Sequence, residues 1–459
     1  MKKLLNRIPH PMALLFYIAI FAAILTYIIP SGSYERETID GQEQTIPGTF
    51  EFTEETHANV MDLFTSIAEG FQEASDIIFI VFAAAMMFGI MEKSGMVENV
   101  VGAFVKRIGV ERRQFIVVIM TFVYGLFGNF IGLENNIVLI PIALLLSIAI
   151  GGDLMLGAGI GIGGVLIGFG LAPFNPYTVG VAQRIAELPL FSGWGLRAIL
   201  VIIALSLLAL YNVRYLNKIL KNENESLTKD IDTTDMQLTK PLSKYFVRKK
   251  DLIMLLVFVL GIIFMLFGIF LKDWYINEIS AIFLMVGVIN GVISRMNANE
   301  ISYTFAKALE PTVLAAVLIG LAQSIQFVLT KGNVNDTIAY SFASILDIFP
   351  SVLSGLFMSF TQSIINLFIA SGSGQALVTM PIMLPVAEQI GMSRQLAILA
   401  FQIGDGITNT FTPTMGGLLA MLGLCKVPFG KWIRYIFPLT IMVFIAGWIT
   451  LIIAALIGY

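Results

Sequence analysis

Two acidic side chains lie inside long apolar stretches of this sequence, where a charge is costly. Glu134 and Asp405 each lie beside a run of polar and small residues. Ionisable groups at membrane depth are rare and usually serve the passage of ions or substrates. No lysine or arginine is expected at comparable depth, since Arg184 and Arg197 fall near helix ends, where their charged groups can reach the interface. The acids therefore favour a ligand with a cationic group, or a coupling proton or cation. The alternatives are a solvated tip for Glu134 and a hydrogen-bonded structural carboxylate for Asp405.

Four short segments interrupt the apolar stretches with prolines, glycines or amides. They are residues 132–136, 171–178, 371–375 and 410–417. A proline removes a backbone N–H group and disfavours the helical conformation of the residue before it. Inside a bilayer, backbone outside a helix persists only beside other protein or a water-filled cavity. A proline kink that carries nothing would explain any one break, but four breaks at matching places in two halves of the chain indicate a binding site.

Such breaks offer two kinds of ion site. Freed carbonyls with Asn, Ser and Thr oxygens suit Na⁺, and the N-termini of half-helices present unpaired N–H groups to an anion. The candidate substrate- and ion-binding residues are Glu134, Asn135, Asn136, Asn175, Pro176, Tyr177, Thr178, Ser371, Gly372, Ser373, Gly374, Gln375, Asp405, Asn409, Thr412, Pro413 and Thr414. The candidate ligands for Na⁺ are Asn135, Asn136, Asn175, Ser373 and Thr412. The coupling ion is expected to be Na⁺ or a proton, and no other cofactor is expected.

The elements that position these residues are expected to be membrane helices. The chain has 459 residues, of which 57% are hydrophobic and 13% charged, with a mean hydropathy of +0.85. The apolar residues come in runs of about twenty, the length that crosses a hydrocarbon core of roughly 30 Å. A net charge of −3 offers no nucleic-acid surface, and the single Cys425 excludes a disulfide within the chain. Spans are expected near residues 12–30, 76–92, 156–186, 193–213, 251–271, 279–294, 310–330, 395–425 and 435–457.

The first apolar run follows Lys2, Lys3 and Arg7, so a cleaved secretory signal is the alternative to a spanning helix. The run is longer than the apolar core of a usual signal, and no small-x-small cleavage site closes it. We therefore expect it to be the first spanning helix.

The charges of the loops predict how the chain threads the membrane. Residues 31–57 hold seven acids and one arginine, which suits the outside, whereas residues 93–113 and the linker 214–250 are basic, which suits the cytoplasm. An even number of crossings must lie between the two basic segments. Residues about 114–150 are therefore expected to form a re-entrant hairpin, although a two-pass segment with a very short outer turn also satisfies the parity. A second hairpin, about 351–386, opens to the opposite face. The N-terminus is then cytoplasmic and the C-terminus outside.

An internal repeat supports this threading. A shift of 240 positions pairs Gly151 with Gly391 and Pro173 with Pro413, and both halves read hairpin, interrupted helix, short turn, helix. We expect an all-α integral membrane protein with about nine transmembrane helices and two re-entrant hairpins, arranged as two inverted-topology repeats. The first repeat covers 1–216, and the cytoplasmic linker 217–250 is expected to be loosely ordered over 222–237. Residues 251–459 hold an extra helix and the second repeat.

Other patterns exclude several classes of function. The glycines of 159–164 match a dinucleotide fingerprint but follow no strand, so they serve close helix packing. Two histidines and one cysteine supply no nucleophile–base set or metal cluster, so an enzyme is not expected. A channel would need a continuous pore, and a structural scaffold would leave the polar breaks unexplained. Residues 97–110 and 334–349 are expected to be interfacial amphipathic helices that brace a scaffold against a moving unit.

Five segments carry a family resemblance: Pro30–Glu35, Asn175–Gln183, Gly404–Asn409, Pro413–Thr414 and Lys426–Trp432. They resemble the YfcC branch of the anaerobic C4-dicarboxylate carrier-like (DcuC-like) family, in the ion transporter superfamily, and the likeness runs over nearly the whole chain. The resemblance implies that paired hairpin tips and unwound helices hold substrate and Na⁺. It also implies a homodimer in the bacterial cytoplasmic membrane that works by an elevator motion.

The resemblance leaves the substrate open. The family name suggests dicarboxylates, whereas related carriers exchange basic amino acids of the arginine–ornithine type. Glu134 and Asp405 suit a cationic substrate, and a dicarboxylate site would gain from a buried arginine, although helix dipoles can replace one. We expect a secondary active transporter of small charged metabolites, an elevator-type antiporter of basic amino acids. The alternative is a carrier of C4-dicarboxylates or other organic anions, coupled to Na⁺ or H⁺.

Overall fold

Helices account for most of the computed structural model, which describes residues 11–39, 42–131, 133–233, 239–272, 274, 276–346 and 351–459. By length and composition, six helices in this described part could cross a membrane: Ser75–Lys93, Val110–Phe130, Trp194–Lys221, Lys249–Gly268, Ile276–Ile293 and Phe429–Ile457. Shorter apolar helices cover Met12–Leu25, Asn135–Ala149, Leu154–Gly170 and Ala316–Lys331. A multi-pass membrane protein follows from these helices, while the count of nine crossings stays a prediction.

The helices of the first half follow the expected order. They are α2 (Pro11–Leu25), α3 (Val60–Glu73), α4 (Ser75–Lys93), α5 (Met96–Ile108), η1 (Val110–Arg112), α6 (Arg113–Ile131), η2 (Glu134–Leu139), α7 (Ile140–Ala149), α8 (Leu154–Ala158), η3 (Gly159–Gly163), α9 (Gly164–Gly170), η4 (Pro176–Gly180), α10 (Val181–Ile185) and α11 (Trp194–Lys221). The linker carries the short turns η5 (Glu223–Glu225) and η7 (Leu242–Lys244).

The helices of the second half begin with the long α12. They are α12 (Lys249–Lys272), α13 (Ile276–Ile293), α14 (Ala298–Leu309), η8 (Glu310–Thr312), α15 (Val313–Lys331), α16 (Asn335–Leu346), α17 (Ser351–Asn366), α18 (Gly372–Gln389), α19 (Arg394–Thr408), α20 (Gly416–Leu424) and α21 (Phe429–Ile457).

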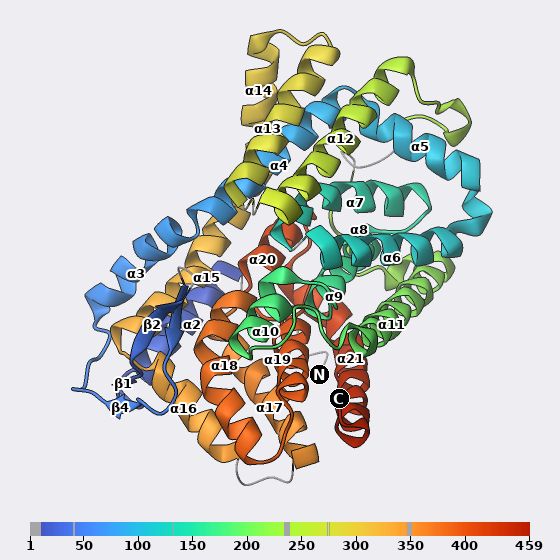
Figure 1. Cartoon of the computed structure of the whole chain (residues 1–459). Helices are drawn as coiled ribbons and strands as arrows, with labels where there is room; N and C mark the ends of the chain where they lie inside the picture. The colour runs from blue at the N-terminus through green and yellow to red at the C-terminus, as the bar shows by residue number, and fades with distance from the viewer. Residues whose placement is uncertain are drawn as a thin grey trace.

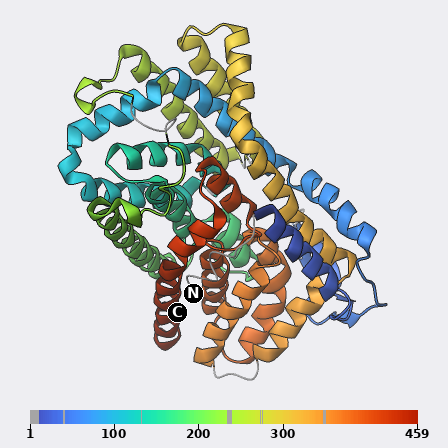
Figure 2. The same cartoon turned by 180° about the vertical axis from the view of Figure 1, so that it is seen from behind.

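One flank of the molecule is built from helices of both halves. Helix α15 packs against α2 and α3, and α13 and α14 pack against α4. Figures 1 and 2 show this flank running diagonally along one side, with the two helical hairpins and the interrupted helices filling the rest. Each half therefore completes the packing of the other.

Helix α3 is absent from the spans expected from sequence, the second of which begins at residue 76. Asp62, Glu69 and Glu73 break the apolar run, so residues 60–73 do not read as a span. They form an amphipathic helix all the same, started by a capping box in which Asn59 and Asp62 bond each other's backbone N–H groups. Gly70 faces the α15 backbone, where an added Cβ would lie 2.6 Å from Gly320 O.

The two stretches expected to be hairpins end in the same way. The first holds α6 and α7, the second α17 and α18, and each is followed by a glycine with positive φ: Gly151 at 86° and Gly391 at 75°. Two residues later Asp153 and Ser393 cap the next helices by accepting from Leu156 N and Leu396 N. These turns bring the interrupted helices α8–α10 and α19–α20 back beside the hairpins.

A small β-structure is an exception to the expected all-α fold. Strand β1 (Gly32–Ser33) pairs with β4 (Glu51–Phe52), and β2 (Arg36–Ile39) pairs antiparallel with β3 (Gln42–Thr45). The hairpin is fastened to α16: Arg36 Nη2 lies 2.8 Å from both carboxylate oxygens of the buried Asp336, and Tyr34 N donates to the same group. The expected amphipathic helix at 334–349 is thus held by a segment distant in sequence; residues 347–350 lie outside the described part.

The linker is better ordered than expected over residues 222–233. Asp153 Oδ2 accepts from Tyr215 and Ser226 hydroxyls at 2.7 and 2.6 Å, and Thr228 is buried. Further along, Tyr245 is buried against α5, where its hydroxyl donates to Glu98. Residues 234–238, which complete the predicted loose segment, lie outside the described part.

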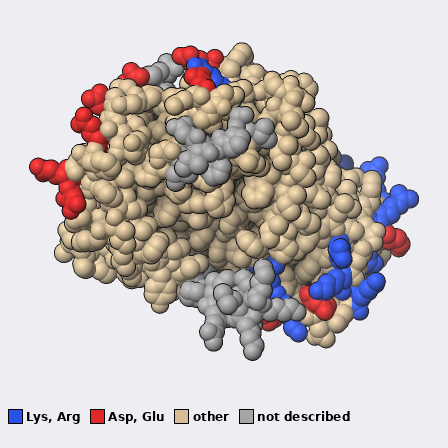
Figure 3. Space-filling view, turned by 90° about the horizontal axis from the view of Figure 1, so that it is seen from below, with Lys and Arg blue, Asp and Glu red and all other residues tan. Residues whose placement is uncertain are grey.

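Charge is segregated on the surface. Figure 3 shows most of the visible Lys and Arg at one end of this face, together with a few acids, and mostly Asp and Glu at the other, with a broad surface of other residues between them. This pattern fits an apolar band between two polar ends, as a membrane protein requires.

Candidate functional site

Asp405 is buried in the last turn of α19, and the end of α17 holds it in place. Asn366 Nδ2 donates to Asp405 Oδ1 at 2.8 Å and lies 3.2 Å from Gln375 Oε1. All three side chains are at most 1% exposed. Among the described residues, no lysine, arginine or histidine forms an ion pair with this carboxyl group. Asp405 is therefore a buried acid whose described partners are amides.

The tip of the second hairpin packs directly on this acid. Ser371 caps α18 by accepting from Gly374 N at 3.3 Å, which places Gly372 at the helix start. A Cβ added at Gly372 would lie 2.4 Å from Thr178 Cγ2 and 3.3 Å from Asp405 Oδ2. Three of the segments predicted from sequence, the first interrupted helix, the second tip and the Asp405 region, therefore meet at one place.

Gly372→Ala is expected to weaken ligand binding by roughly 5–100-fold, the equivalent of about 1–3 kcal/mol of overpacking. The added methyl group must displace either the stiff Thr178 side chain or the tip itself. Ligand-induced shifts in melting temperature, titrated on purified protein, measure the affinity.

Gly374→Ala is the matched control, since its Cβ would lie no closer than 3.2 Å, to the Ser371 Oγ of the same turn. Equal affinities for the two variants would contradict the close packing of Gly372.

An amide network fixes the shape of the second hairpin. Gln375 Nε2 donates to Gln362 Oε1 at 2.6 Å and to Gln362 O at 2.9 Å, and Gln362 Nε2 donates to Thr379 Oγ1. These side chains are fully buried between α17 and α18. Satisfied buried networks of this kind favour one packing over others. Gln375 was predicted as a site residue, and the structure gives it a second task in holding the tip.

The first break owes its stability to two amide side chains. In a helix, Phe169 O and Ala172 O would accept from the N–H groups of residues 173 and 176, but both are prolines. Asn175 Nδ2 donates to Phe169 O at 3.2 Å, and Gln402 Nε2 donates to Ala172 O at 2.8 Å. Each carbonyl that a proline leaves without a helical donor thus receives a side-chain N–H group. The side chains of Pro176 and Tyr177 lie outside the described part.

The second break is held by a tryptophan and two threonines. Trp432 Nε1, from the fully buried indole on α21, donates to Thr410 O at 2.9 Å. Thr412 Oγ1 lies 3.0 Å from Thr414 Oγ1, which donates to Leu367 O beside the second tip. The break that contains Pro413 is therefore tied to the tip by hydrogen bonds.

The two interrupted helices cross in backbone contact. A Cβ added at Gly170 would lie 2.5 Å from Gly406 O, and one added at Gly406 would lie 2.2 Å from Gly170 O. Gly170 ends α9 just before the first break, and Gly406 follows Asp405 directly. The glycines thus allow the two breaks to lie next to each other.

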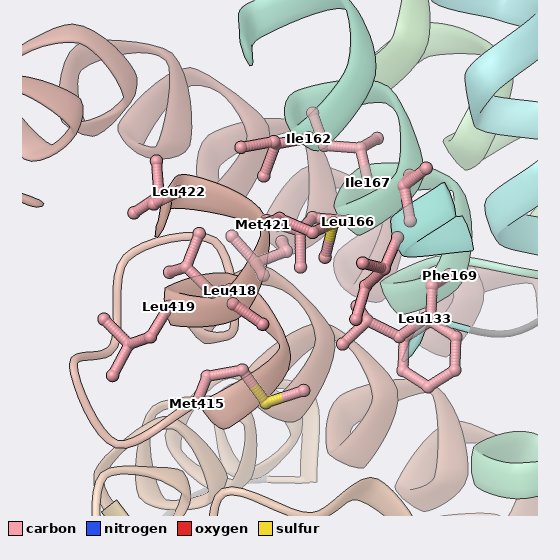
Figure 4. Close-up of a cluster of buried hydrophobic side chains, with 14 of the residues drawn as sticks. Leu133, Ile162, Leu166, Ile167, Phe169, Met415, Leu418, Leu419, Met421 and Leu422 are labelled. Atoms are coloured by element: carbon pink, nitrogen blue, oxygen red, sulfur yellow. The ribbon is translucent and has the colours of Figure 1, made fainter. Parts of the chain in front are cut away.

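Beyond the breaks, an apolar cluster joins the halves. Figure 4 shows Leu166, Ile167 and Phe169 of α9, with Leu133 beside the first tip, facing side chains of α20. The α20 side chains in the cluster are Leu418, Leu419, Met421 and Leu422, with Met415 just before the helix. The cluster therefore buries apolar side chains of both halves beside the polar breaks.

Several buried oxygen atoms near Asp405 make no hydrogen bond to any described residue. They are Thr178 Oγ1, Asn366 Oδ1, Thr408 Oγ1 and Asn409 Oδ1. Asn409 lies one helical turn beyond Asp405, and its Nδ2 likewise has no hydrogen-bond partner among the described residues. Oxygen ligands of this type suit a hard cation or a ligand ammonium group. No cluster of three or more His, Cys, Asp or Glu residues occurs in the described part.

The first hairpin tip has different surroundings. Its turn η2 packs against α4, α7 and α20, Asn135 and Asn136 are buried there, and Asn136 Nδ2 donates to Phe127 O at 3.1 Å. Gly132 and the side chain of Glu134 lie outside the described part. Ser373, on the second tip, is partly exposed. The five-residue Na⁺ set and the role of Glu134 therefore stay predictions.

Arg197 corrects the expectation that no base is buried. Its guanidinium is fully buried by the protein, whereas Arg184 is exposed. Its nitrogens donate to Gln402 Oε1 at 3.0 Å, Gln395 Oε1 at 2.9 Å and Ser192 O at 2.7 Å. The sequence placed this residue near a helix end, and the α10–α11 turn and α19 cover it there. The premise that the site is purely acidic is therefore weaker than the sequence indicated.

Comparisons with known proteins indicate a membrane transporter. A family model described as the C4-dicarboxylate anaerobic carrier matches residues 8–456. The Escherichia coli K12 protein named "Putative basic amino acid antiporter YfcC" is 26% identical, with 98% of this chain and 97% of that protein covered. A Haemophilus influenzae protein whose name gives no function is 25% identical, with 98% of each chain covered.

Two solved structures are similar over most of their length. Neisseria gonorrhoeae MtrF, described with a class of antimetabolite efflux pumps, has 20% identity and a TM-score of 0.45, with 98% of this chain and 95% of that one covered. The Alcanivorax borkumensis YdaH transporter has 17% identity and a TM-score of 0.45, with 98% and 99% covered.

Proposed function

This chain belongs to the C4-dicarboxylate anaerobic carrier family and is a membrane transporter, and from that premise we propose that it is a secondary antiporter of basic amino acids of the arginine–ornithine type. The observation that carries the proposal is the buried Asp405 carboxyl group, in contact with the second tip and next to Thr178. A buried carboxylate without a basic partner is costly, and a cationic substrate would supply the missing charge.

Exchange follows from this electrostatic requirement. An empty site would have to cross the membrane with an uncompensated carboxylate, whereas a site filled by a substrate cation would not. Movement of the loaded unit is therefore favoured over movement of the empty one, which is the condition for obligatory exchange. The name of the Escherichia coli relative, a basic amino acid antiporter, supports the same substrate class.

A carrier of C4-dicarboxylates or other organic anions is the second candidate. The description of the family supports it, and so does the buried Arg197, a base that a purely cationic site would not need. In that case Asp405 would bind the coupling Na⁺ or carry the coupling proton. Both candidates place the ligand at the junction of Thr178, Gly372 and Asp405.

We propose two inverted repeats, each with a re-entrant hairpin, that move as an elevator. Matching contacts support this arrangement: α6 packs on α9 as α17 packs on α19, and α5 packs on α7 as α16 packs on α18. The pairing of α2 with α15 likewise matches that of α13 with α4. In the proposed motion, the hairpins and interrupted helices move against the flank, and α5 and α16 serve as the connecting arms.

The remaining expectations complete the proposal. The protein is a homodimer in the bacterial cytoplasmic membrane, crosses it nine times, and has its linker inside and its C-terminus outside. Glu134 of the first tip joins Asp405 in binding substrate or coupling ion. The segregation of acidic and basic side chains supports the orientation.

Purified protein in liposomes preloaded with arginine is expected to take up radiolabelled ornithine, and to do so only when a substrate is present inside. The difference in uptake between preloaded and empty liposomes measures the requirement for exchange. A thermal-shift series with arginine, ornithine, succinate and fumarate, each with and without Na⁺, reports binding directly, because a bound ligand stabilises the folded state by mass action. Uptake or stabilisation by the dicarboxylates alone would overturn the basic amino acid assignment in favour of the second candidate.

A further inference from the structure

The guanidinium of Arg197 is in an unfavourable place for a positive charge. It lies in the first turn of α11, where the helix dipole is positive, and it is fully buried. Its described acceptors are neutral, and the ring of Tyr459 lies 5.7 Å away as a weak further partner. Burial of a charge without a counter-charge costs several kcal/mol. A neutral hydrogen-bond donor at position 197 could hold the start of α11 in place equally well. The charged arginine therefore needs a separate explanation.

The guanidinium determines how Gln402 is oriented. An arginine side chain can only donate, so Gln402 must turn Oε1 toward Arg197 Nε. Its Nε2 then points the other way and donates to Ala172 O at 2.8 Å. A neutral partner such as glutamine would accept either orientation of Gln402. Arginine permits only the one that serves the first break.

The carbonyl that accepts this hydrogen bond, Ala172 O, belongs to the candidate site. Ala172 O lacks a helical donor because residue 176 is proline, and the same break leads into Thr178, which contacts Gly372. On α19, Gln402 lies three residues before Asp405, which is about one helical turn. The chain of contacts from Arg197 therefore ends at the junction where ligand is proposed to bind.

We propose that Arg197 is a positioning residue for this junction: by fixing the amide of Gln402, it holds the Ala172 carbonyl and with it the first break in the binding conformation. The proposal rests on the transport function for its kinetic test. Its structural test, the protection of the break, does not depend on which substrate is carried.

Gln402→Glu separates positioning from anchoring. A glutamate keeps and strengthens the contact with Arg197, but it has no N–H group to offer Ala172 O. Gln395→Glu is the matched control, since Gln395 Oε1 also accepts from Arg197 while its Nε2 bonds Ser192 Oγ rather than the break. Both variants place one carboxylate on the same guanidinium.

Gln402→Glu is expected to raise the KM for arginine exchange by about tenfold, the effect of one lost buried hydrogen bond, with its melting temperature unchanged or higher. Gln395→Glu is expected to keep the wild-type KM within about twofold. Arg197→Lys retains the charge but not the planar fork, and it is expected to raise KM as Gln402→Glu does. Equal KM values for the two glutamate variants would overturn the proposal.

Hydrogen–deuterium exchange of the ligand-free protein tests the same relay without any substrate. Peptides covering residues 168–182 are expected to exchange faster in Gln402→Glu and in Arg197→Lys than in wild type, and at the wild-type rate in Gln395→Glu. Unchanged exchange in Gln402→Glu would overturn the proposal even if arginine is transported. Faster exchange in a protein that moves no basic amino acid would uphold the positioning role and refute only the proposed substrate.

Discussion

Asp405→Asn is expected to abolish exchange while leaving the fold intact. Asparagine has nearly the same shape, and its Oδ1 can still accept from Asn366 Nδ2. The lost charge removes the partner of a substrate cation, an effect of about 3 kcal/mol or more, which is over a hundredfold in affinity. Because the buried carboxylate has only amide partners among the described residues, its removal should leave the melting temperature equal or higher.

The control is Asp336 of α16, a carboxylate that is also buried but whose described partners are Arg36 and Tyr34 N rather than residues of the breaks. Asp336→Asn removes the ion pair with Arg36, so it should lower the melting temperature yet leave the KM for exchange unchanged. Proteoliposome exchange and thermal unfolding, measured on both variants, give the comparison. Exchange at the wild-type rate in Asp405→Asn would remove Asp405 from the site and with it the main support for a cationic substrate.

Gly406→Ala is expected to destabilise the protein strongly for the addition of a single methyl group. The new Cβ would lie 2.2 Å from Gly170 O and 2.5 Å from Gly170 Cα. Both are backbone atoms, so no side-chain rotation relieves the overlap, and the two interrupted helices must separate. We expect a loss of about 3 kcal/mol in the free energy of unfolding, together with lower exchange at temperatures where the variant is still folded, because both breaks move.

Gly163→Ala is the matched control for Gly406→Ala. It also adds a methyl group to a buried glycine of an interrupted helix, but the nearest atoms are the Leu208 methyl groups at 3.2 and 3.3 Å, which can rotate away. Thermal unfolding in one detergent compares the two. Equal melting temperatures would show that the crossing is looser than the contact distances indicate.

The sequence predicted the bounds of the helices in the two long apolar stretches and the places of the interruptions well, since their signals are local. An apolar stretch with a polar interruption near its middle marked residues 114–150, and the structure has α6 and α7 over Arg113–Ala149. The second stretch, 351–386, holds α17 and α18 over Ser351–Gln389, and the re-entrant course of both stretches stays a prediction. Prolines marked the two breaks because their effect on the backbone does not depend on distant residues.

The partners that stabilise the breaks could not be found in this way. Gln402 donates to a carbonyl 230 positions away, and Trp432 donates to Thr410 O from α21, so neither carries a local signal. The burial of Arg197 likewise depends on α19 covering the start of α11. Asn366 did carry a weak signal, because a shift of 237 positions, close to the 240 of the internal repeat expected from sequence, pairs it with Asn129. Helix α3 was not predicted although its signal is local, because its acidic residues interrupt the apolar run and the amphipathic spacing was not recognised.

The interleaved packing of the flank has a consequence for biosynthesis. Helix α2 packs on α15, and α4 packs on α13 and α14, so the first half leaves the ribosome before its partners exist. Until α15 is made, the face of α3 that holds Leu63, Ser66 and Gly70 lacks the helix that buries it in the folded protein. The early helices must therefore wait in the bilayer or with insertion factors, and final assembly is late and cooperative. A stalled or truncated product that ends in the linker would lack α13, α14 and α15. We expect it to be degraded rather than to persist as a folded half.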